Sequence, residues 1–105
     1  MNKRKILDEL TNVLSAALRH KIGSIVNSSE IYAQKYAKDA EIMMKEAEKI
    51  SLGKNWNNQD KAEIKAILKR KLKAELENKE FIDNRKFELV DSEIEKALKV
   101  LKKAK

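Results

Sequence analysis

The chain contains no proline and only two glycines, Gly23 and Gly53, in 105 residues. These two residue types interrupt helices most strongly, so long helical stretches face few breaks. Lysine, glutamate, alanine, leucine and isoleucine are abundant, and all of these residues are compatible with helices. Aromatic residues make up 5% of the chain, too few for a typical β-sandwich or barrel. The composition therefore favours long α-helices.

Apolar residues recur at steps of three and four in four segments, which is the period of an α-helix. The segments are residues 3–26, a stretch from the Asn27–Glu30 junction to Gly53, a stretch from Asn58 or Asp60 to about Lys79, and one from near Ser92 onward. Short connections between such helices indicate antiparallel neighbours. We expect an all-α, four-helix bundle-like fold in a single domain that covers residues 1–105.

Candidate caps mark the ends of these helices. The spacing of a capping box, in which a short polar residue precedes a glutamate by three positions, predicts three helix starts. The pairs are Asn27 with Glu30, Asp60 with Glu63, and Ser92 with Glu95. Gly53 suits the left-handed cap at the end of the second helix. Gly23 costs up to about 1 kcal/mol inside a helix, so it weakens the last turn of the first one.

Residues 81–90 allow two interpretations. The apolar pairs on either side of Asp83-Asn84 are consistent with a short β-hairpin around a turn. They are equally consistent with an irregular connection between helices. A hairpin at 81–90 would make the alternative fold a winged helix, in which the third helix reads DNA. The first two helices are long for that fold, so the bundle is the preferred expectation.

The net charge of +7 comes from 24 basic and 17 acidic residues, and only four of the basic residues are arginines. Lysine is a mobile point charge, whereas arginine provides the planar fork that reads guanine. This balance favours weakly sequence-specific attraction to a polyanion. The candidate nucleic-acid contacts are two clusters: Lys3, Arg4 and Lys5, and Lys69, Arg70 and Lys73. Our first hypothesis is a non-enzymatic protein that binds nucleic acid or a nucleoprotein complex. A solvated charged face is the simpler explanation of each cluster.

The alternative hypothesis is a protein–protein interaction module, such as an adaptor, an inhibitor, an immunity-type bundle or a self-associating homo-oligomer. Alanines on one face of the second helix would let another helix approach closely. Trp56 lies in a polar loop, where it either covers the core between helices two and three or anchors a partner. We favour the structural role of Trp56, and keep it as the candidate partner-binding residue.

No residue pattern indicates catalysis, a metal or a cofactor. His20 is the only histidine, and Ser24 one turn later lacks a nearby carboxylate to complete a triad. There is no cysteine, and basic residues interleave with the acidic ones. No apolar run approaches the ~18 residues of a membrane span. Asp8 and Glu9 interrupt any signal-peptide core, so we expect a non-enzymatic, cytoplasmic protein without membrane association.

Overall fold

The first helix, α1, is the element against which every other element packs. The computed structural model describes residues 3–52, 55–79, 82 and 84–103, with the side chains of the last two left out. Its elements are α1 (Lys3–Val26), α2 (Ala33–Ser51), α3 (Asn58–Glu77), the short 3-10 helix η1 (Asn84–Leu89) and α4 (Val90–Lys103). Over these residues the protein is all-α and bundle-like, as the sequence predicts.

The helices share one hydrophobic core whose members follow the helical period. From α1 it takes Leu7, Leu10, Leu14, Leu18 and Ile22, and from α3 Ile64, Leu68, Leu72 and Leu76. The remaining members are Ala47 of α2, Ile82, and Val90, Ile94 and Ala97 of α4. Burial of these side chains is the main favourable term in folding.

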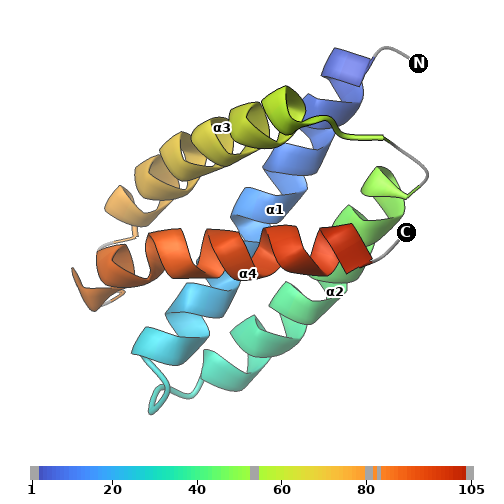
Figure 1. Cartoon of the computed structure of the whole chain (residues 1–105). Helices are drawn as coiled ribbons and strands as arrows, with labels where there is room; N and C mark the ends of the chain where they lie inside the picture. Colours follow the sequence, from blue (N-terminus) through green and yellow to red (C-terminus); the bar gives the residue numbers. More distant parts are fainter. Residues whose placement is uncertain (1–2, 53–54, 80–81, 83, 104–105) are drawn as a thin grey trace.

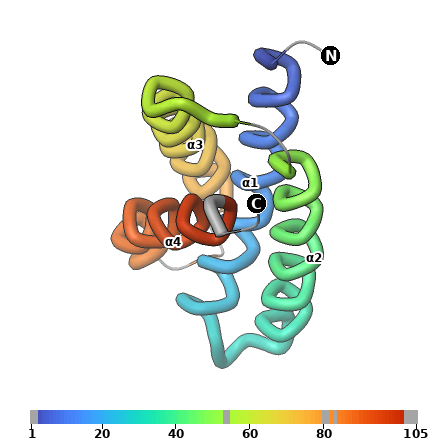
Figure 2. The backbone as a smooth tube through the Cα atoms, turned by 45° about the vertical axis from the view of Figure 1, so that its right-hand side comes forward, coloured from blue at the N-terminus to red at the C-terminus, as the bar shows by residue number. Residues whose placement is uncertain are grey.

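The four helices alternate in direction, and α4 lies obliquely across the others (Figure 1). Helices α2 and α3 flank α1, and α4 packs over α1 and touches both flanking helices. Figure 2 shows α4 and α2 as separate rods that both lean on α1. Because α4 crosses rather than aligns with α2, the two helices share few contacts. This leaves an open space between α1, α2 and α4.

Gly23 lies inside α1 and marks a close approach between helices. A Cβ atom at this position would lie 3.2 Å from Cδ2 of Tyr36 and 3.5 Å from Cδ1 of Ile82. The helix continues to Val26, so Gly23 does not end it. The residue is explained by the ring of Tyr36 packing on the backbone of α1.

The predicted capping box of Asn27 and Glu30 is wrong. The Asn27 side-chain amide donates to the Tyr32 hydroxyl at 2.9 Å, and α2 begins only at Ala33 without a side-chain cap. Two turns intervene, closed by bonds from Glu30 N–H to the Asn27 carbonyl and from Ala33 N–H to the Glu30 carbonyl. The predicted cap at Gly53 lies outside the described residues.

Helix α3 begins at Asn58, one of the two predicted starts, but its cap is a different pair. Asn57 Oδ1 accepts from Asp60 N–H at 2.7 Å, and Asn57 N–H donates to Asp60 Oδ2 at 3.1 Å. The prediction of a box formed by Asp60 and Glu63 is wrong. Aspartate replaces the more common glutamate at the third helical position, and the capping box begins three residues earlier than predicted.

Of the two interpretations of residues 81–90, the hairpin is wrong, and so is the winged-helix alternative that depended on it. The described residues of this stretch form η1 and no strand, while Phe81 and Asp83 lie outside them. Ile82, Lys86 and Val90 are buried at steps of four, which is a helical rather than an alternating pattern. Helix α4 then follows directly at Val90, so Ser92 lies inside its first turn and bonds the Leu89 carbonyl instead of capping.

Candidate functional site

The N-terminal basic cluster is partly committed to the protein itself. Lys3 forms an ion pair with Asp60 at 2.5 Å and donates to the Asn55 carbonyl. Arg4 pairs with Glu63. Two hydrogen bonds hold the pKa of Asp60 below its ordinary value. The larger effect comes from the Lys3 ammonium and the smaller from the backbone N–H of Asn57. Two of the three predicted cations therefore already have carboxylate partners.

Lys5 is exposed and has no carboxylate partner among the described residues.

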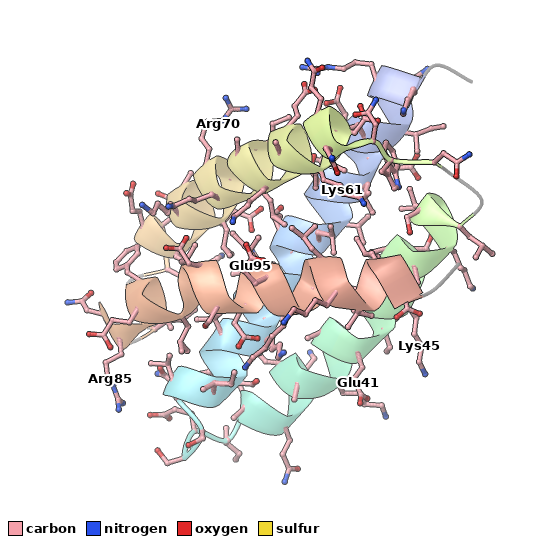
Figure 3. The ribbon with its side chains drawn as sticks, in the orientation of Figure 1. Glu41, Lys45, Lys61, Arg70, Arg85 and Glu95 are labelled. Carbon is pink, nitrogen blue, oxygen red and sulfur yellow. The ribbon has the colours of Figure 1, made fainter. Side chains whose placement is uncertain are left out.

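The cluster on α3 is divided in the same way. Lys69 lies 3.2 Å from Asp91 of α4, and Lys65 one turn earlier pairs with Glu95. Arg70 and Lys73 are exposed without a carboxylate partner among the described residues. Figure 3 shows Arg70 extending away from the helices into solvent. Along α3, Glu63 and Lys69 are six positions apart, which is about 9 Å of helix.

Trp56 is half-buried and packs against the edge of the hydrophobic core. Its indole Nε1 is buried and has no hydrogen-bond partner among the described residues. The Lys3 ammonium lies 5.6 Å from the ring centroid, a cation–π arrangement. These contacts are those of a residue that closes the core between α2 and α3.

His20 and Ser24 do not bond to each other. His20 Nδ1 lies 2.8 Å from the Ala16 carbonyl, and Ser24 Oγ donates to the Lys21 carbonyl at 2.7 Å. Both side chains contact backbone carbonyls of α1 itself. Over the described part of the chain, no group of three histidines or carboxylates is placed to hold a metal ion.

A groove of about 600 Å³ lies between α1, α2 and α4, and no pattern in the sequence predicts it. Its floor is apolar and is built largely from small residues. The least exposed of its apolar lining residues form this floor: Ala17 and Leu18 of α1, Ala40 and Met44 of α2, and Ala97 of α4. Ile25, 44% exposed, and Val100, 39% exposed, form its lips. The groove therefore opens to solvent through apolar side chains.

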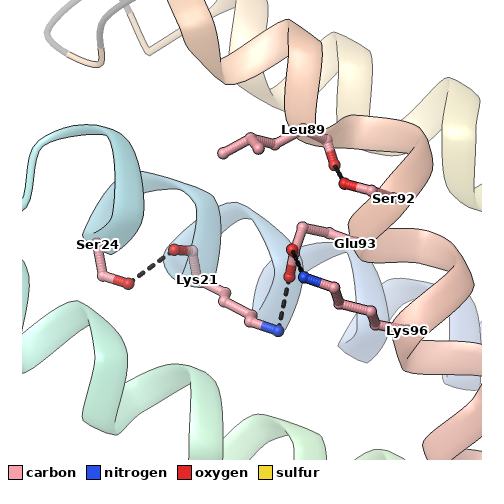
Figure 4. A network of polar contacts seen from close by, with 6 residues as sticks. All are labelled: Lys21, Ser24, Leu89, Ser92, Glu93 and Lys96. Carbon is pink, nitrogen blue, oxygen red and sulfur yellow. Dashed lines mark hydrogen bonds and ion pairs between the residues drawn. The ribbon is translucent and has the colours of Figure 1, made fainter.

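Glu93 is the buried charge beside this groove, with a side chain only 1% exposed. Its Oε1 lies 2.6 Å from Lys21 Nζ of α1, and its Oε2 accepts from Lys96 Nζ at 3.2 Å (Figure 4). Burial alone would raise the pKa of Glu93, but the two ammonium groups outweigh it and leave the pKa below its ordinary value. The ionised carboxylate thus ties α4 to α1.

The remaining charges on the rim are Lys38 and Glu41 of α2. Both side chains are exposed, and neither has an ion-pair partner among the described residues. The groove therefore has an apolar floor, three lysines on its rim, and two glutamates of which one is already neutralised.

Comparisons with protein-family models, with curated proteins and with solved structures found no match. None of the described helices is both long and apolar enough to cross a membrane. The groove and the basic residues are therefore the features from which a function can be argued.

Proposed function

We propose that this protein is a non-enzymatic binding module whose groove between α1, α2 and α4 receives an amphipathic α-helix of a partner protein. The observation that carries the proposal is the open, apolar groove of about 600 Å³. A concave, mostly apolar surface between the helices of a bundle is a common place for a binding site. An apolar groove between helices is the usual receptor for the apolar face of a further helix.

The dimensions of the groove suit a helix. Its α2 wall runs from Gln34 to Met44, eleven residues that span about 15 Å. A bound helix of about three turns would match that length. The short side chains of Ala17, Ala40 and Ala97 leave depth in the groove, so the row of side chains on a docked helix can enter it.

The charge of the chain favours a different protein over a second copy. Two copies would each carry a net charge of +7, and the lysines of both rims would be brought together. Like charges across an interface oppose association. The proposed occupant is therefore a helix from a partner of opposite charge.

A library of displayed amphipathic 15-residue helices, selected on the purified protein, tests this function. Enriched helices are re-measured with Ile25→Gln and Val100→Gln, which make the lips of the groove polar. Each change should weaken binding by about 5-fold, because it removes about 1 kcal/mol of apolar contact. Ile42→Gln is the matched control, since Ile42 is 59% exposed on α2 and does not line the groove.

Two results would overturn this function. One is a selection that enriches no helix, or enriches helices that the two lip variants bind unchanged. The other is a dimer in sedimentation equilibrium that the lip variants dissociate, because it would assign the groove to a second copy.

Nucleic-acid binding is the second candidate, favoured by the exposed Lys5, Arg70 and Lys73, which lack carboxylate partners among the described residues. If it holds, affinity for duplex DNA, single-stranded DNA or RNA should fall linearly in a log–log plot against salt. Arg70→Glu with Lys73→Glu should then reduce the affinity and the salt slope. Absence of binding at low salt would remove this candidate.

A further inference from the structure

We infer that the helix received by the groove carries an acidic residue opposite the Lys21–Lys96 pair, another opposite Lys38, and one bulky apolar anchor. This inference rests on the proposed function and names the chemistry of the partner. It is carried by the positions of three lysines around the groove and by the small side chains of its floor.

The first edge of the groove carries a surplus positive charge. Lys21 and Lys96 share the single carboxylate of Glu93, so one charge of the pair is not balanced. Their side chains are 43% and 65% exposed, which leaves N–H donors available to an incoming group. Each ammonium has three donors, and Glu93 occupies only part of them. A carboxylate on the docked helix could bridge the two lysines.

The second edge belongs to α2. Lys38 lines the groove, is exposed and has no ion-pair partner among the described residues. Glu41, three residues later, is the one rim carboxylate of the described residues that no cation neutralises. This edge therefore presents one cation and one anion in a known order. A docked helix gains most by placing an acidic residue opposite Lys38 and none opposite Glu41.

The floor selects the anchor. Ala17, Ala40 and Ala97 come from three different helices and are each less than a tenth exposed, so small side chains meet from three sides. Met44 borders them with an unbranched side chain that can adapt its shape. A leucine or phenylalanine of the partner would fill this space, whereas an alanine would leave it empty.

Three labelled 15-residue helical peptides test the inference by fluorescence anisotropy. All share one apolar face with a central phenylalanine. They carry glutamate, glutamine or lysine at a single position on each edge of that face, one to meet Lys21 and Lys96 and the other to meet Lys38. We expect the glutamate peptide to bind about 5- to 10-fold more tightly than the glutamine peptide, and the lysine peptide more weakly than either. The difference should shrink in 1 M salt, where screening acts over about 3 Å.

Lys38→Glu and Glu41→Lys form a reciprocal pair of variants, and neither residue contacts Glu93, so the α1–α4 tie stays intact. Lys38→Glu should weaken the glutamate peptide by about 5-fold, and Glu41→Lys should strengthen it by a similar factor. Replacing the central phenylalanine by alanine should weaken all three peptides by more than 10-fold.

The outcomes separate this inference from the function on which it rests. If none of the three peptides binds and the helix selection also fails, the proposed function is wrong. If all three bind equally, and the two rim variants change nothing, helices dock but the acidic preference is wrong. If the alanine version binds as well as the phenylalanine version, the anchor is wrong.

Discussion

Glu93 is the residue whose chemistry depends most on its surroundings. Its carboxylate is buried, yet it keeps its charge because Lys21 and Lys96 approach it from two helices. A buried charge is tolerated only with such partners. At this single residue, packing of α4 on α1 and the charge pattern at the groove are coupled.

Glu93→Gln should lower the unfolding free energy at pH 7 by about 1–3 kcal/mol, because the two lysines lose their charged partner. The folded pKa of Glu93 lies below the ordinary 4.5, so ionisation stabilises the fold above that pH. This contribution is lost as the pH falls through the lower, folded pKa. Urea unfolding at pH 7 and pH 3 should therefore show a smaller pH dependence for Glu93→Gln than for the natural protein. Equal pH dependence would contradict this role.

Gly23 shows how a neighbour decides the meaning of a glycine. Gly23→Val places branched atoms against the Tyr36 ring, which lies 3.2 Å from an added Cβ. We expect a loss of about 2 kcal/mol in unfolding free energy, through overpacking between α1 and α2. Ala66→Val, on the exposed side of α3, is the control and should cost no more than about 0.7 kcal/mol. Thermal unfolding of both variants checks the comparison, and equal losses would argue against close packing at Gly23.

At the scale of elements, helix ends depend on single side chains. Asn57→Ala removes the bond in which the Asn57 side-chain oxygen accepts from the Asp60 N–H at the start of α3, and should cost about 1 kcal/mol. Asn58→Ala, one residue later, is exposed and makes neither capping bond, so it should be close to neutral. Chemical denaturation at pH 7 measures both. A larger effect at Asn58 would mean that the box does not cap the helix.

The connection between α3 and α4 illustrates why local patterns mislead. Lys86 is 2% exposed, and its ammonium donates to the Lys79 carbonyl, near the end of α3, at 2.7 Å. A lysine in a polar stretch is ordinarily expected at the surface. Here it satisfies a backbone acceptor near the end of a helix, where cations are favoured by the helix dipole. That bond helps to place η1 against the core, where a hairpin was one expectation.

At the scale of the molecule, one core joins all the helices, so they should unfold together. Leu14→Ala, at a position with no exposed surface, should reduce the unfolding free energy by about 3 kcal/mol. Leu52→Ala is the control, since Leu52 is 58% exposed. Helical circular dichroism and Trp56 fluorescence should give the same transition midpoint in both variants. Separate midpoints would mean that the Trp56 end unfolds independently.

The apolar period by itself determined the four helices, the all-α class and most of the buried leucines and isoleucines. These follow from local geometry, because residues three and four apart lie on one side of a helix whatever it meets. The sequence also predicted Asn58 as one of two possible starts of α3, and the helix begins there. The caps predicted at Asn27 and Ser92 do not form, since the same residue types occur in caps, turns and helix interiors alike.

The groove and the state of the basic residues were decided only by tertiary structure. The alanines of α2 suggest close approach, but the oblique course of α4 leaves the space beside them open. The sequence alone gives no ion-pair partner for three of the basic residues, Lys3, Arg4 and Lys69. In the structure each pairs with a carboxylate at least 22 residues away in the chain. Helical periodicity reports which face of each helix is buried. It does not report how helices cross, and the crossing places the partners of each charge.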